Sequence, residues 1–279
     1  MNSIKRYELA RRMYVPVKVG GRRSYGGRQQ WFSKDIKKTK DLKAYFTHMN
    51  GCGVIALSDL FLYFAMTIPE GKDTHAAQFM DKYKNVTQEE YMKFVDIIQD
   101  KYAKIYGSCG TFGWELSRAV NSYCKDNSLP YEAAFEVGLS NLEMLHKMQD
   151  MLTHNYPVIL MIGQSWPVSL SKLRKVGIPF FKRTWAKRST SELATRSYVA
   201  YEIAERNVYG HFVVVTGVII DEKANWASQK IMLKISSWGE EYYISYDHYC
   251  QFLKRISKPW LCGLISLSKQ EQVENEPAK

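Results

Sequence analysis

The first half of the chain carries apolar residues at helical spacing. A nearly unbroken apolar run extends from Cys52 to Met66, interrupted only by Ser58 and Asp59 after its opening Cys-Gly. Such a run predicts a helix buried in a domain core. Further helices are expected where apolar residues recur every three or four positions, at 87–106, 112–126 and 140–154.

From Pro157 onward the pattern changes to short β-branched and apolar runs. Expected strands cover 158–162, 211–220, 231–236, 242–246 and 261–267. Helices followed by antiparallel strands are typical of an α+β fold. Residues 164–207 are basic and aromatic without a clear period, and we expect a long excursion with some helix. Such insertions commonly form a lid or a cleft wall.

Composition narrows the class of protein. Hydrophobic residues make up 46% and charged residues 24%, which is ordinary for a globular domain. No apolar run reaches transmembrane length and the first residues have no signal-peptide core, so we expect a cytoplasmic protein. Five cysteines without a CxxC pair indicate neither a disulfide framework nor a zinc site, and we expect no metal and no cofactor.

Positive charge is concentrated near the start of the chain. The net charge is +11, and residues 1–43 contain 13 Lys or Arg against three acids. We therefore divide the chain into a basic N-terminal arm (1–40), a main domain (41–268) and a polar tail (269–279). The main domain would have a helical half (41–155) and a sheet half (156–268). Nucleic-acid binding is not expected, because no recognition motif accompanies the charge.

Cys52 is the leading candidate for chemistry. It lies between Gly51 and Gly53 at the start of the expected core helix, where the helix dipole and free N–H groups favour a thiolate. The alternative is an inert buried cysteine. A nucleophilic thiol needs a base, and His211 opens the strand 211–217 at a sheet edge where a cleft can expose it.

These segments resemble the papain-like cysteine peptidases, closest in style to the bacterial C39-like branch. The matching parts are Gly51-Cys52-Gly53 before an apolar helix, Pro157-Val158-Ile159-Leu160, the strand 211–217, and 231–239 ending in Ser236-Ser237-Trp238-Gly239. The resemblance covers about residues 50–250. It implies a papain-like α+β fold in which the Cys helix packs on a C-terminal antiparallel sheet.

The resemblance also implies site roles. Cys52 would be the nucleophile, His211 the general base and acid, and Trp238 a shield over the His. The third catalytic position, Asn or Asp in the family, is Ser236 here. The family's oxyanion Gln would fall on Phe46, which cannot donate a hydrogen bond; Asn50 or Gln164 would replace it.

Rival residues and functions stay open. Cys109 is a second Gly-flanked cysteine, and His248 and His48 are alternative histidines. The expected function is hydrolysis of a peptide or isopeptide bond in a peptide or protein substrate, through an acyl-thioester on Cys52. The alternatives are a Cys–His acyltransferase and an inactive papain-fold binding or regulatory module.

Overall fold

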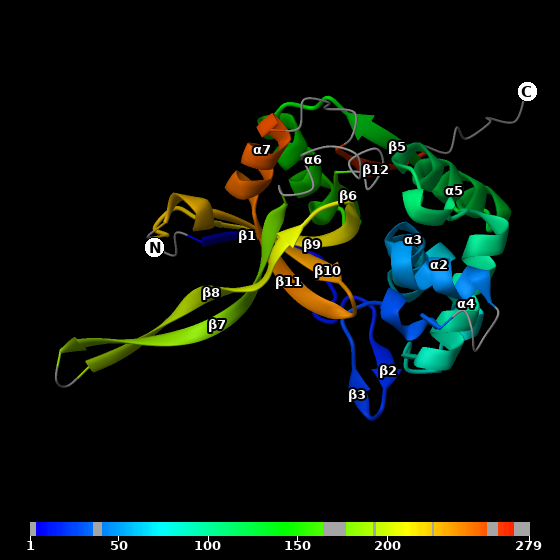
Figure 1. The fold of residues 1–279 in the computed structure, drawn as a ribbon, viewed down its shortest axis with the longest axis horizontal. Helices are drawn as coiled ribbons and strands as arrows, with labels where there is room; N and C mark the ends of the chain where they lie inside the picture. The colour runs from blue at the N-terminus through cyan, green and yellow to red at the C-terminus, as the bar shows by residue number, and fades with distance from the viewer. Residues whose placement is uncertain are drawn as a thin grey trace, which may run out of the picture.

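The computed structural model describes residues 4–35, 41–163, 177–191, 194–224, 226–255 and 262–270. The chain combines a group of helices with a large antiparallel sheet, and the expected α+β class is confirmed. In Figure 1 helices α2 to α5 gather on the right of the view, whereas the long central strands lie to their left.

The helices agree with the apolar periodicity. They are α2 (Leu42–Asn50), α3 (Cys52–Thr67), α4 (Gln88–Lys101), α5 (Gly113–Asp126), α6 (Asn141–Thr153) and α7 (Tyr246–Arg255). Every residue of α3 from Gly53 to Met66 is buried, as its apolar sequence predicts. Helix α6 begins with a complete capping box, in which Ser140 and Glu143 satisfy each other's backbone N–H groups.

The main sheet has nine strands among the described residues. Their order is β5-β12-β6-β9-β10-β11-β7-β8, and β1 also pairs with β9. The strands are β1 (Ile4–Glu8), β5 (Tyr131–Val137), β6 (Val158–Ile162), β7 (Ile178–Ser191), β8 (Ala194–Val208), β9 (His211–Asp221), β10 (Ile231–Ser237), β11 (Glu240–Ser245) and β12 (Gly263–Lys269). Strand β5 was not expected. Strand β12 reaches Lys269, which the sequence pattern had placed in the tail, and residues 271–279 lie outside the described part.

Strand β9 organises the sheet. Its first half pairs with β6 from Val158 to Ile162, and its second half pairs with β1 from Ile4 to Glu8. Strand β10 lies along its other edge, and helix α3 packs against it. The start of β9 therefore meets the start of α3 in the interior.

The expected excursion is largely a β-ribbon. Strands β7 and β8 form one long antiparallel hairpin, which projects from the lower left of the body in Figure 1. Strand β7 pairs with β11 at Phe181 and Tyr243, and the ammonium of Lys182 on β7 also donates to Glu240 Oε2 at 2.6 Å. The expectation of helix in this region is wrong for residues 177–191 and 194–207, because β-branched and aromatic residues there pair as strands. Residues 164–176 lie outside the described part.

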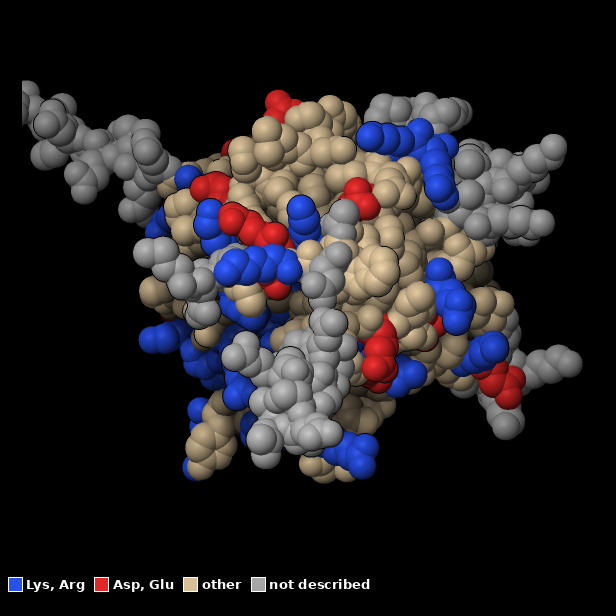
Figure 2. Space-filling view, turned by 90° about the vertical axis from the view of Figure 1, so that its left-hand side faces the viewer, with Lys and Arg blue, Asp and Glu red and all other residues tan. Residues whose placement is uncertain are grey.

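The basic N-terminal segment is part of the fold rather than a separate arm. Besides β1 it forms β2 (Val17–Val19) and β3 (Arg22–Arg23), which join β4 (Val86–Thr87) in a small second sheet. Tyr14, Val15 and Val17 are buried in the main core. Five of its six arginines are exposed, and Arg11 is half-buried. Figure 2 views the side of the molecule that lies at the left of Figure 1, and Lys and Arg side chains gather toward the lower left of that view.

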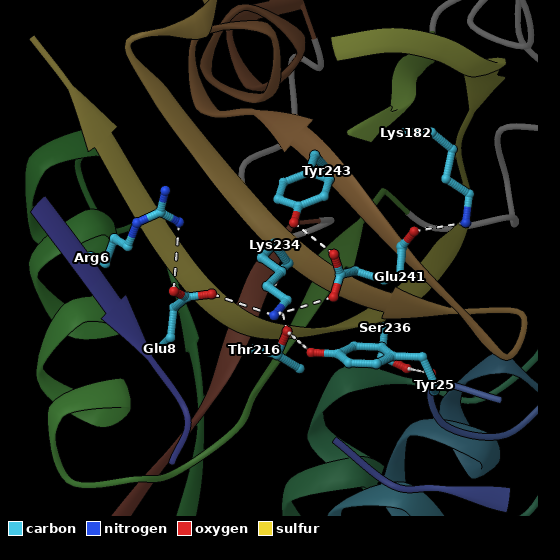
Figure 3. Close-up of polar contacts among 9 residues, drawn as sticks. All are labelled: Arg6, Glu8, Tyr25, Lys182, Thr216, Lys234, Ser236, Glu241 and Tyr243. Carbon is cyan, nitrogen blue, oxygen red and sulfur yellow. Dashed lines mark hydrogen bonds and ion pairs between the residues drawn. The ribbon is translucent and has the colours of Figure 1, made fainter. Parts of the chain in front are cut away.

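A charged cluster fixes this segment to the sheet (Figure 3). The ammonium of Lys234 on β10 lies 3.4 Å from a carboxylate oxygen of Glu8 and 3.2 Å from one of Glu241. Beside it, the hydroxyl of Tyr25 hydrogen-bonds to Thr216 Oγ1 at 2.9 Å. These contacts join β1, the loop at Tyr25, β9, β10 and β11.

Among the described residues, no single helix is both long enough and apolar enough to span a membrane. Helices α2 and α3 reach spanning length only as a pair, and they meet at a bend of 85°.

Candidate functional site

Cys52 is the first residue of α3, directly after the bend. Gly51 permits this bend, because a Cβ atom there would overlap the carbonyl oxygen of Thr47. Gly53 lets β9 approach, since its Cβ position lies only 3.4 Å from the Phe212 ring. Backbone N–H groups of Phe212 and Gly53 reach the Cys52 sulfur and lower the pKa of the thiol, but burial has the larger effect and raises it.

His211 is the first residue of β9 and is buried. It stands opposite Ile162 of β6, and the preceding Gly210 donates its N–H to the Ile162 carbonyl at 2.7 Å. Burial lowers the pKa of His211 to about 3. The surroundings of Cys52 and His211 thus favour a neutral thiol beside a neutral imidazole in the resting protein.

Cys52 and His211 line the same two small cavities. The first has a volume of about 50 Å³ and is also walled by Gln29, Asn50, Cys109 and Gly163. The second has a volume of about 20 Å³ and is also lined by Asp59, Ser236 and Ser237. The fold therefore unites a thiol from the helical part with an imidazole from the sheet.

The hydroxyl that contacts the His211 ring belongs to Ser237 and not to the expected Ser236. The Ser237 hydroxyl lies 2.8 Å from His211 Nε2. Ser236 instead donates its hydroxyl to the carbonyl of Tyr25 at 2.6 Å (Figure 3). Successive side chains of a strand point to opposite faces, so an error of one residue exchanges the two roles. The β9–β10 register itself shifts between Lys234 and Ile235.

Trp238 lies against His211 as a shield would. The two rings are stacked, with centroids 4.7 Å apart and planes inclined by 24°. Trp238 and Gly239 form the two-residue turn between β10 and β11, and both have positive φ, 49° and 76°. A tryptophan is strained in this conformation, and such strain is characteristic of functional positions.

The structure places the residues considered for the oxyanion site differently. Asn50 lines the first cavity, but its amide donates to the Gly107 carbonyl at 3.0 Å. Phe46 lies near Gly107. Gln164 lies outside the described residues.

Gln29 is a site residue that the sequence did not reveal. It begins the short 3-10 turn Gln29–Trp31, is only 8% exposed, and lines both cavities. Its amide nitrogen donates to the His48 carbonyl at 2.9 Å and, over a longer distance, to the Met49 carbonyl at 3.4 Å. The residue is far from Cys52 in sequence and lies in the segment taken for an arm, so only tertiary folding brings the two together.

Of the alternative cysteine and histidines, only Cys109 lines the cavity that contains Cys52. Cys109 lines the first cavity with Cys52, at the end of the 3-10 turn Gly107–Cys109. His48 Nδ1 hydrogen-bonds the Phe32 carbonyl at 2.8 Å. His248 on α7 stacks on Phe181, and its backbone N–H donates to the Ser245 hydroxyl at 3.2 Å.

Taken together, the site offers a nucleophile, a base with a hydroxyl partner, an aromatic cover and an amide donor. This set is suited to nucleophilic acyl chemistry. Comparison of the chain with protein-family models, with curated proteins and with solved structures gave no match.

Proposed function

We propose that this protein is a papain-like cysteine hydrolase that cleaves a peptide or isopeptide bond through an acyl-thioester on Cys52. The observation that carries the proposal is that Cys52, at a helix N-terminus, and His211, at a strand start, share one cavity. The stacked Trp238 and the bond from His211 Nε2 to Ser237 support it further.

In the acylation step, the Cys52 sulfur attacks the substrate carbonyl carbon while its proton passes to His211. Because Nε2 is engaged by Ser237, Nδ1 is the ring nitrogen left to accept that proton. The oxyanion that forms receives hydrogen bonds from the backbone N–H of Cys52 and from the amide of Gln29, which gives up its longer bond to the Met49 carbonyl. His211 then gives its proton to the leaving amine as the carbon–nitrogen bond breaks.

In the second step, His211 removes a proton from water, which attacks the thioester carbonyl. The carbon–sulfur bond breaks and the thiol is restored together with a carboxylic acid. If an amine attacks in place of water, the same residues perform acyl transfer. The second outcome is distinguished by adding a primary amine and looking for the amide product by mass spectrometry.

The proposal is tested by alkylation of the native chain with iodoacetamide, followed by peptide mass mapping. We expect Cys52 to react faster than Cys109, which lines the same cavity and serves as the internal control. His211→Ala should abolish the preference, because the thiol loses its base. Equal slow labelling of both cysteines would contradict the proposal and favour a binding module with an inactive site.

A further inference from the structure

Asp59 is a buried carboxyl that the mechanism above does not use. It lies two helical turns after Cys52 on α3 and is 2% exposed. One carboxylate oxygen, Oδ1, accepts the N–H of Gly27 at 2.9 Å and the hydroxyl of Tyr91 at 2.7 Å. Burying a carboxylate is costly unless it is well hydrogen-bonded. An uncharged Asn or Gln at this position would avoid that cost, so the presence of a carboxylate calls for a role.

The second carboxylate oxygen, Oδ2, lies next to Gly26 and on the side of the Ser236 hydroxyl, since a Cβ atom on Gly26 would be 2.5 Å from Oδ2 and would also overlap Ser236 Oγ. It accepts only a longer bond from Gly27 N–H, at 3.1 Å. Asp59 and Ser237 both line the cavity of about 20 Å³, along with Ser236 and His211. A polar cavity of this size accommodates one water molecule.

We propose that Asp59 is the positioning carboxylate of this site, acting on His211 through Ser237 and one water molecule in that cavity. The inference rests on the proposed hydrolase function. Hydrogen bonds would run in one direction, from His211 Nε2–H to Ser237 Oγ, from the Ser237 hydroxyl to the water, and from the water to the Asp59 carboxylate. This direction holds the proton on Nε2 and leaves the Nδ1 lone pair for the thiol.

The relay would compensate for the solvation that His211 loses through burial. An imidazolium at this position lacks bulk water, and a neutral serine cannot compensate its charge. An ionised Asp59 at the end of the chain stabilises the imidazolium that forms during acylation. The carboxylate of the usual third residue is thus replaced by one from the nucleophile's own helix.

Of Asp59 and the titratable groups that face it, Asp59 is the group expected to change charge near neutral pH. They are Tyr14 from the N-terminal segment, Tyr91 from α4, and Cys52 and His211 across the cavity. Burial raises the pKa of both tyrosines and of the thiol, and it lowers that of His211. Burial raises the pKa of Asp59 to about 7.

The test measures the rate of Cys52 alkylation by iodoacetamide against pH in the full chain. In the wild type we expect a step near pH 7, with faster alkylation above it as Asp59 ionises. Asp59→Asn keeps hydrogen-bond acceptors for Gly27 and Tyr91 but removes the charge. It should remove the step and slow alkylation at pH 8 by about tenfold.

Two further variants separate positioning from folding. Ser237→Ala should remove the same step, and Asp59→Asn should then add nothing, because both substitutions break one relay. Tyr91→Phe keeps the carboxyl but removes a bond that lowers its pKa, so the step should persist at higher pH. If Asp59→Asn fails to fold, the pH profile of Cys52 alkylation in Ser237→Ala still tests the relay.

The outcomes are distinguishable from failure of the proposed function. Preferential Cys52 alkylation with an unchanged profile in Asp59→Asn or in Ser237→Ala would overturn the relay alone. Independent, additive losses in the double variant would do the same. Loss of the Cys52 preference in the wild type would instead overturn the hydrolase proposal and the relay with it.

Discussion

The indole of Trp238 covers the imidazole of His211 at a centroid separation of 4.7 Å. Phe180 adds a second aromatic wall, 5.5 Å from Trp238 and 6.4 Å from His211 between ring centroids. This enclosure is the physical cause of the low pKa of His211, because it withholds the water that would solvate an imidazolium.

Replacing Trp238 by Ala should therefore raise the pKa of His211 from about 3 toward the ordinary value near 6.5. The residue at this turn keeps its positive φ in either case, so the backbone strain is not relieved. The measurement is an NMR titration of the His211 ring, assigned by comparison with His211→Asn. Trp185→Ala is the control, because Trp185 is 69% exposed on the β7–β8 ribbon and should leave the titration unchanged.

Gln29→Ala should lower turnover without slowing alkylation of Cys52. Loss of one oxyanion donor typically costs a factor of about 100 to 1,000 in turnover, whereas iodoacetamide forms no oxyanion. The assay compares hydrolysis of a peptide substrate with the alkylation rate of the same variant. Gln30→Ala is the matched control, since Gln30 is exposed and next in sequence. Equal loss of both rates in Gln29→Ala would show that Gln29 only supports the local structure.

Gly27→Ala should destabilise the fold by about 3 kcal/mol or more. A Cβ atom at this position would overlap the Tyr91 hydroxyl and displace the N–H that binds Asp59. Gly138→Ala is the control. Its φ of 74° is also unfavourable for alanine, but its Cβ would meet open space, and the expected cost is about 1 kcal/mol. Urea unfolding of both variants gives the comparison, and equal costs would refute the role of close packing.

Asp59→Asn should raise the free energy of unfolding more at pH 8 than at pH 5. The folded-state pKa of about 7 lies above the ordinary value of 3.8, so the folded protein binds the proton more tightly than the unfolded chain. Stability from this group is complete below pH 4 and falls as pH rises to 7, by about 4 kcal/mol at most. Asparagine carries no charge, so the variant escapes this loss. Thermal unfolding at the two pH values checks the difference, and an equal effect at both would contradict it.

The sequence alone determined the elements whose patterns are local. The apolar run after Cys52 required a buried helix, and the β-branched runs at 158–162, 211–220 and 231–236 required strands, because burial follows from side-chain type and spacing. It also singled out Cys52, His211 and Trp238, which the fold brings together. Strand β5 escaped notice although its sequence alternates, with apolar residues at 131, 133, 135 and 137 and glutamates at 132 and 136.

The remaining parts of the site depend on contacts between distant segments of the chain. Gln29 and Gly27 belong to the N-terminal segment, whose high positive charge predicted an exposed arm and not a packed part of the fold. In the sequence, Asp59 is only one of two polar residues in an otherwise apolar helix. The exchange of Ser236 for Ser237 depends on the strand register. Such contacts join residues far apart in the chain, and local pattern carries no information about which distant surfaces meet.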